Sequence, residues 1–134
     1  MTDKKKELQY EAMKTRRAAE REITQAVIRF EKEYMGRGPL DAKTFILDDL
    51  VLVRLKDVLT PAEHQLAEIE TRERGRYLIK QVRQELLERG RPLLEAIIRD
   101  VLAQTVVSLH TDISTKTGER IIVLTLQQAV TLAE

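Results

Sequence analysis

The chain contains no cysteine and no tryptophan, and only 4% of its 134 residues are aromatic. A chain without cysteine cannot form disulfides, thiolate metal sites or a cysteine nucleophile, and it fits a reducing compartment. Few aromatic rings disfavour single-stranded nucleic-acid binding, which depends on base stacking. Apolar runs stay well short of the roughly 18 residues that cross a bilayer. No apolar segment follows the charged residues 1–7, as a secretory signal would require. We therefore predict a cytoplasmic protein without membrane insertion.

The charges are nearly balanced, with 23 Lys and Arg against 22 Asp and Glu. A nucleic-acid-binding protein usually carries a basic excess, so this total disfavours a nucleic-acid partner. Hydrophobic residues make up 43% of the chain, enough for a packed core of Leu, Ile and Val. The length suits a single domain.

The clearest helical pattern starts at Ile23. Val27, Phe30 and Tyr34 follow it at i+4, i+7 and i+11, which places all four on one face of a helix. The Gly-Arg-Gly-Pro sequence at residues 36–39 should end this helix. The residues before Ile23 are highly charged with mixed signs, which predicts a helical extension or a tail.

Two β-hairpins are expected. The first joins β-prone residues 43–47 and 50–55 through Asp48 and Asp49, and aspartate tolerates the positive φ of a tight turn. The second joins residues 105–114, which alternate in polarity, to residues 120–126. Gly118 supplies a left-handed position in that turn.

Two more helices should lie between the hairpins. Thr60, Pro61 and Glu63 form a helix start with a capping box. Residues 72–103 are helical in pattern but contain Pro92. Proline removes a backbone hydrogen bond and clashes with the preceding turn, so a kink or a break is predicted there.

These elements predict an α+β fold in the order α–ββ–α–α–ββ, with a four-stranded antiparallel sheet and helices on one face. Residues 1–22 would be the N-terminal helical extension or tail, 23–126 the single domain, and 127–134 a tail or short helix. The strand at 120–126 is apolar on both faces, so something should cover the second face of the sheet. A second copy of the chain is the simplest cover, which predicts a homodimer or larger homo-oligomer.

No catalytic, phosphate-binding or dinucleotide-binding motif is present, and no metal or cofactor is predicted. The best candidate for a ligand site combines His110 and Asp112, which share one face of a strand, with Arg54 on a strand of the same sheet. These side chains can form a small site for an anion or a proton. The alternative is a polar strip at a sheet face or dimer seam.

Three stretches resemble the bacterial MpsC-like family: AVIRFEKEYMGRGP at residues 26–39, VLVRLKDVLTPAE at 51–63 and SLHTDISTKTGER at 108–120. The similarity spans roughly residues 20–126. The family is named after a proposed subunit of a sodium-translocating system that generates a membrane potential. The resemblance implies an accessory or regulatory role beside an ion or bicarbonate transporter, and it supplies no functional residues.

We therefore predict a non-enzymatic accessory or regulatory protein, with a membrane transporter subunit as a partner. One alternative is a nucleic-acid-binding module that uses a basic arm of residues 4–6, Arg16, Arg17 and Arg21. Another is a small enzyme or ligand-binding protein that uses the face with His110, Asp112 and Arg54.

Overall fold

The computed structural model describes residues 14–68 and 72–134. Their elements follow the predicted α–ββ–α–α–ββ order: α2 (Arg16–Tyr34), β1 (Asp41–Leu47), β2 (Leu50–Lys56), α3 (Pro61–Glu68), α4 (Arg72–Leu102), β3 (Val106–Ile113) and β4 (Arg120–Leu126).

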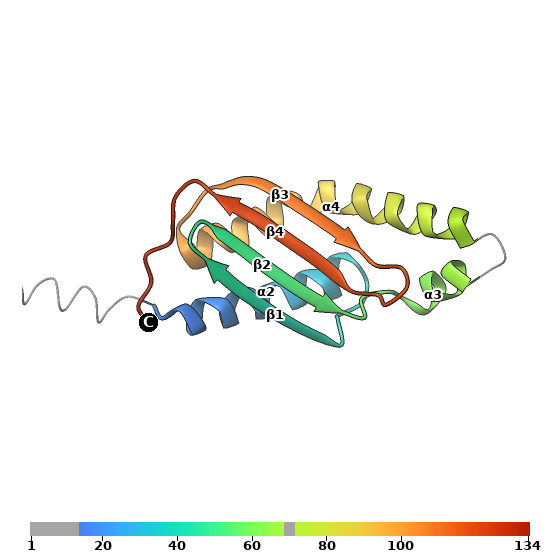
Figure 1. The fold of residues 1–134 in the computed structure, drawn as a ribbon, viewed down its shortest axis with the longest axis horizontal. Coiled ribbons are helices and arrows are strands. Elements are labelled where there is room, and N and C mark those ends of the chain that lie inside the picture. The colour runs from blue at the N-terminus through green and yellow to red at the C-terminus, as the bar shows by residue number, and fades with distance from the viewer. Residues whose placement is uncertain (1–13, 69–71) are drawn as a thin grey trace, which may run out of the picture.

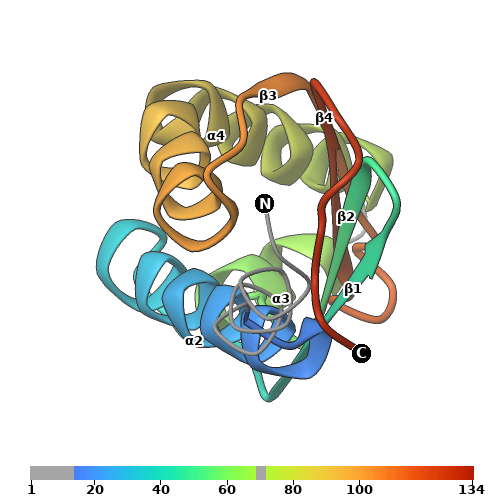
Figure 2. The same ribbon diagram turned by 90° about the vertical axis from the view of Figure 1, so that its left-hand side faces the viewer.

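The four strands form one antiparallel sheet in the order β1-β2-β4-β3. Each hairpin pairs internally, and the contact between β2 and β4 joins the two hairpins. Helices α2 and α4 lie on the same face of the sheet, behind the strands in Figure 1 and on one side of them in Figure 2. The predicted fold class is confirmed, and β1 and β3 are the edge strands.

Both turns have the expected chemistry. Asp48 has a φ of 56°, and it lies in the turn that brings Leu47 opposite Leu50. Gly118 has a φ of 75° in the turn between β3 and β4. An aspartate and a glycine occupy these left-handed positions because both tolerate positive φ better than most residues.

Helix α2 begins at Arg16, earlier than the domain start predicted at residue 23. Thr15 is its N-cap, and the Thr15 hydroxyl accepts a hydrogen bond from the backbone N–H of Ala18 at 3.1 Å. Ala19 is fully buried and belongs to the same core as Ile23, so the helix joins the domain one turn earlier. The first thirteen residues of the predicted extension lie outside the described residues.

The C-terminal residues 127–134 form an irregular segment that returns to the start of α2. Ala133 is buried and pairs with Thr15, and the N–H of Arg16 donates to the carbonyl of Ala133 at 2.9 Å. Residues 127–134 contain no helix and pack against the start of α2.

Helix α4 is continuous from Arg72 to Leu102, so Pro92 does not break it, and the predicted kink stays a prediction. Proline in a helix interior costs about 3 kcal/mol, and packing on both sides offsets that cost. Leu87 and Leu94 are buried on either side of Pro92. Gly90 is also buried, where a Cβ would lie only 2.8 Å from the ring of Phe30 in α2. The close contact with α2 stabilises the part of α4 that contains Pro92.

The core lies between the helices and the inner face of the sheet. Alternate residues of β2 and β4 are buried there, namely Val51, Val53, Leu55, Ile122, Leu124 and Leu126. No helix or strand of the described residues covers the outer face (Figures 1 and 2). None of the helices in the described ranges combines the length and apolarity needed to cross a membrane.

Candidate functional site

The outer face of the sheet carries all three predicted site residues. Arg54 on β2 and Asp112 on β3 both pair with Ile121 of β4, one from each side. His110 lies two residues from Asp112 and pairs with Val123. Because β4 separates β2 from β3, Arg54 and Asp112 are two strand spacings apart, about 10 Å between Cα atoms.

Each of these side chains has a different partner. Arg54 donates to Glu119 at 2.7 Å, and Asp112 accepts from Lys80 at 3.2 Å. His110 is exposed, and its Nε2 lies 3.3 Å from the hydroxyl of Ser108. The structure therefore places the three residues on one face without joining them in one network. Their role as a ligand site stays a prediction.

The pKa of Asp112 is lowered from its ordinary value. The main cause is the hydrogen bond that the backbone N–H of Ile113 donates to the Asp112 carboxylate at 2.8 Å, and Lys80 adds a smaller effect. Asp112 is therefore a carboxylate near neutral pH, held by Lys80 and its own backbone and not by His110.

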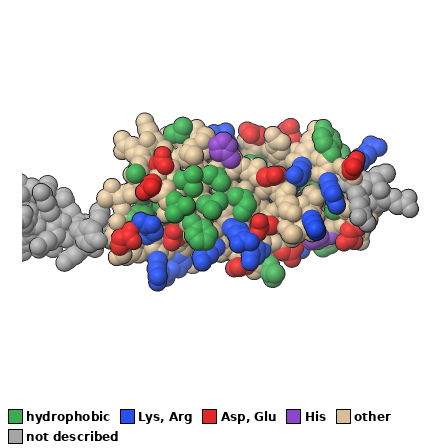
Figure 3. Space-filling view, in the orientation of Figure 1, with side chains coloured by type: hydrophobic (Ala, Val, Ile, Leu, Met, Phe, Trp, Pro, Cys, Tyr) green, Lys and Arg blue, Asp and Glu red, His purple; other side chains and the backbone are tan. Residues whose placement is uncertain are grey.

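The centre of the outer face is apolar. We call the following residues the outer-face patch: Phe45, Leu47, Leu50, Leu52, Ile121 and Val123. Cross-strand pairing aligns Phe45, Leu52 and Val123 in one row, and Leu47 is 52% exposed. Figure 3 shows apolar side chains gathered over the middle of the sheet, with charged side chains around them. A contiguous exposed apolar patch is typical of an interaction surface.

A buried ion-pair cluster lies on the opposite side of the sheet, among the helices. It consists of Glu31 of α2, Glu63 of α3, Arg83 of α4 and Arg120 of β4. Arg120 donates to Glu31 at 2.9 Å, and Arg83 donates to both oxygens of Glu63 at 2.7 and 2.8 Å. Glu31, Arg83 and Arg120 are 0%, 5% and 2% exposed. These four side chains link every helix described to the sheet.

The pKa values of the two carboxylates of the cluster are shifted in opposite directions. Burial raises the pKa of Glu31 above its ordinary value, against the opposing effects of Arg120 and Arg83. Burial also acts to raise the pKa of Glu63, but the hydrogen bonds from Arg83 and Thr60 outweigh it, and that pKa is lowered. Glu63 is therefore ionised at neutral pH, and its two oxygens accept hydrogen bonds from the guanidinium of Arg83.

The sequence reasoning missed this cluster, although a signal was present. Glu31 follows Ile23 and Val27 at i+8 and i+4, on the buried stripe of its helix. In the same way, Arg83 falls four residues after Ile79, which is buried. Arg120 shares the inward face of β4 with Ile122 by strand alternation. A charge on an apolar stripe is expected to have a buried partner.

The structure tests part of the proposed basic arm. Arg16 pairs with Glu134 at 2.5 Å, and Lys14 pairs with Glu22 at 2.7 Å. Arg17 and Arg21 are exposed on α2. Residues 4–6 lie outside the described residues, so the full arm stays a prediction. No group of three or more metal-ligating side chains occurs within residues 14–68 and 72–134.

Comparison with known proteins gives a family. The chain matches the MpsC family, described as a "Na+-translocating membrane potential-generating system (MpsC)", over residues 15–128. It is 42% identical over 113 residues to the uncharacterized protein YbcI of Bacillus subtilis, which covers 84% of this chain and 89% of that protein. No solved structure matches the chain significantly. The match includes all the described helices and strands, and the chain belongs to the MpsC family.

Proposed function

We propose that the protein is a non-enzymatic accessory or regulatory subunit of an ion-translocating system and that it works as a homodimer joined through the outer-face patch. The family description supports the transport setting. The observation that carries the proposal is the outer-face patch itself. A sheet that is apolar on both faces needs a second cover, and the described part of the chain supplies one only for the inner face.

The arrangement of charges favours a second copy as the cover. One row across the outer face runs from Lys43 through Arg54 and Ile121 to Asp112, so cations lie at the β1 edge and a carboxylate at the β3 edge. A two-fold axis parallel to the strands reverses this row in the second copy. Lys43 then lies over Asp112 of the partner, and the apolar centres of the two patches meet. The face is therefore complementary to itself, as a two-fold interface requires.

The size of the face sets the expected affinity. Four strands about 4.8 Å apart and seven residues long, at about 3.4 Å per residue, give a face of roughly 450 Å². Two copies would bury about 900 Å², below the roughly 1,200–2,000 Å² of standard stable interfaces. Interfaces of this size are typical of weak, transient association, so we expect the dimer to form only as the protein concentration rises.

Light scattering after size exclusion tests the dimer. The wild-type protein should approach twice the 15.5 kDa of one chain as its concentration rises. Leu52→Lys places a charge in the centre of the patch and should give a monomer. Leu93→Lys is the matched control, because Leu93 is 51% exposed on α4, away from the outer face. A wild-type monomer at several hundred micromolar, or a Leu52→Lys dimer, would refute this interface.

The transport role needs a test in cells. Deleting the gene in the native host should change the membrane potential, measured with a potential-sensitive dye, or the rate of sodium efflux. The wild-type gene and Leu93→Lys should restore the normal values, and Leu52→Lys should not. If neither quantity changes on deletion, the transport setting is wrong even where the dimer is real.

A further inference from the structure

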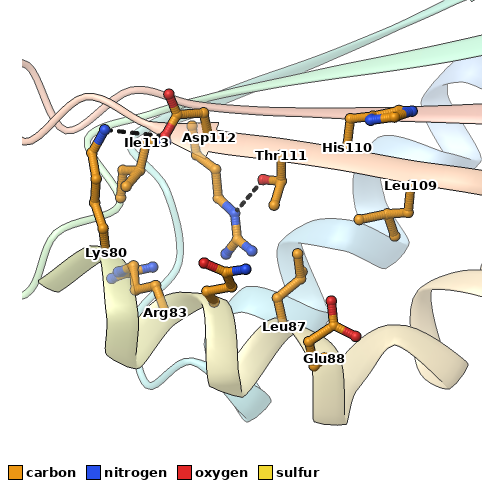
Figure 4. Close-up of a pocket in the computed structure, with 11 residues that line it drawn as sticks. Lys80, Arg83, Leu87, Glu88, Leu109, His110, Thr111, Asp112 and Ile113 are labelled. Carbon is orange, nitrogen blue, oxygen red and sulfur yellow. Dashed lines mark hydrogen bonds and ion pairs between the residues drawn. The ribbon is translucent and has the colours of Figure 1, made fainter. Parts of the chain in front are cut away.

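A cavity of about 360 Å³ lies between the edge strand β3 and helix α4. Its lining includes Lys80, Arg83 and Glu88 from α4, Thr111 from β3, and Arg120 from β4. In Figure 4, Lys80 extends from α4 to Asp112, and Thr111 points from β3 into the space above the helix. His110 and Asp112 also line the cavity, which therefore reaches the β3 edge of the outer face.

Two of the three cations that line the cavity are buried. Arg83 and Arg120 are 5% and 2% exposed, and a guanidinium keeps its proton in proteins. Lys80 adds a third positive charge at the mouth, where its side chain is 49% exposed. Glu63 and Glu31 already pair with these arginines, so the attraction for an anion rests on Lys80 and on N–H groups that remain without a partner in the described part of the chain.

One of the two arginines, Arg83, has a buried donor without a partner in residues 14–68 and 72–134. The Nη1 atom of Arg83 is buried and has no hydrogen-bond partner among the described residues. The nearest carboxylate oxygen recorded for it, Oε2 of Glu31, is 4.0 Å away and also lacks a partner. Arg120 uses Nη1 on Glu31 and Nε on Thr111, at 2.9 and 3.3 Å. A buried donor without an acceptor is unfavourable by about 1–3 kcal/mol, and an oxygen-rich ligand would remove that cost.

We propose that this cavity binds a small anion through a carboxylate or phosphate group. Arg120 and Arg83 form the buried end of the site, and Lys80 closes the mouth over the ligand. The ion pair between Lys80 and Asp112 does not oppose this role, because both side chains are exposed and such pairs contribute little. Glu88 repels a ligand at the rim. The site borders the proposed dimer interface at Asp112, and its test is separate from that of the transport role.

Thermal unfolding of the intact protein tests the site. Sodium phosphate, bicarbonate and acetate are compared with sodium chloride at constant ionic strength, which separates phosphate-type from carboxylate-type ligands. A ligand that binds only the folded protein raises the unfolding temperature as its concentration exceeds its dissociation constant. We expect at least one oxyanion to do so beyond chloride, and to shift the Nε–H nuclear magnetic resonance signals of Arg83 and Arg120.

Two variants that should change the affinity for the anion in opposite directions make the test specific. Lys80→Gln should raise the dissociation constant of the anion about tenfold, because the variant loses one charge-assisted hydrogen bond to the ligand. Glu88→Gln should tighten it, because the repulsion at the rim is removed. Both side chains are exposed, so folding should be unaffected, and Lys32→Gln and Glu33→Gln on exposed positions of α2 are the controls. The proposal is wrong if no oxyanion exceeds chloride, or if the two cavity variants respond as the controls do.

Discussion

The carboxylate of Glu63 connects the start of α3 to α4, and replacing it with glutamine tests the buried ion-pair cluster. One oxygen of Glu63 accepts from the backbone N–H of Thr60 at 3.0 Å and from Arg83 at 2.7 Å, and the other accepts from Arg83 at 2.8 Å. Glutamine also serves in a capping box, so Glu63→Gln keeps the helix cap. The change removes the negative charge beside Arg83 together with one of the two hydrogen bonds that Arg83 donates to Glu63.

The structure sets the size of the effect. Arg83 is 5% exposed and stays protonated. The variant leaves a buried cation that keeps its hydrogen bond to the carbonyl of Val58, and the nearest carboxylate recorded for it is that of Glu31, at 4.0 Å. Removing one partner of a buried ion pair costs about 3–5 kcal/mol. The side chain of Glu63 is 20% exposed and glutamine still accepts one hydrogen bond, so we expect about 3 kcal/mol, near the lower limit. For a chain of this length that lowers the unfolding temperature by roughly 10 °C.

The loss of unfolding free energy in Glu63→Gln should become smaller as the pH falls. The pKa of Glu63 is lowered by folding, so its charge stabilises the native state above its ordinary pKa of 4.5 and that contribution disappears as the pH falls through the lowered value. The difference between wild type and Glu63→Gln should be largest at pH 6–8 and should shrink in acid. The raised pKa of Glu31 acts in the opposite sense, but Glu31 is present in both proteins, so its effect largely cancels in the difference.

Urea unfolding followed by circular dichroism at neutral and acid pH measures these free energies. Thr60→Ala serves as the control, since it removes the N-cap hydroxyl and leaves the ion pair. It should cost about 1 kcal/mol and depend on pH less than Glu63→Gln does, because the Thr60 hydroxyl is the smallest of the causes that shift the pKa of Glu63. An equal midpoint for wild type and Glu63→Gln at pH 7 would refute the reasoning, and so would a cost that does not change with pH.

Two further substitutions test the packing of α4 and the role of the exposed histidine. Gly90→Ala should destabilise by about 1–2 kcal/mol, because the new methyl group would lie 2.8 Å from Phe30 and 3.0 Å from Tyr34, and this overpacking exceeds the gain in helix propensity. A more stable Gly90→Ala protein in urea unfolding would show that α2 and α4 are not so close. His110→Ala should change stability by less than about 0.5 kcal/mol, because His110 is exposed with one 3.3 Å contact. A large loss in the same assay would make His110 a structural residue.

Local sequence signals were enough to predict the hairpins and helices. Asp48 and Gly118 provide the positive φ angles of their turns, and the box of Thr60 and Glu63 starts α3. The stripe from Ile23 to Tyr34 gives the buried face of α2. Each of these features depends on residues a few positions apart, where backbone sterics, capping and periodicity decide the structure.

Only the tertiary structure decided the features that depend on distant residues. Arg120 and Glu31 are 89 residues apart in sequence, and their pairing requires β4 to lie beside β2 with α2 beneath the sheet. The continuity of α4 through Pro92 likewise depends on its packing around Gly90, which offsets a local cost that the sequence shows plainly. Strand alternation indicated that His110 and Asp112 share a face, and the pairing of β2 and β3 with β4 brings Arg54 to the same face. Their separate partners, and the cavity that Arg83 and Arg120 line, follow from how α4 lies against β3.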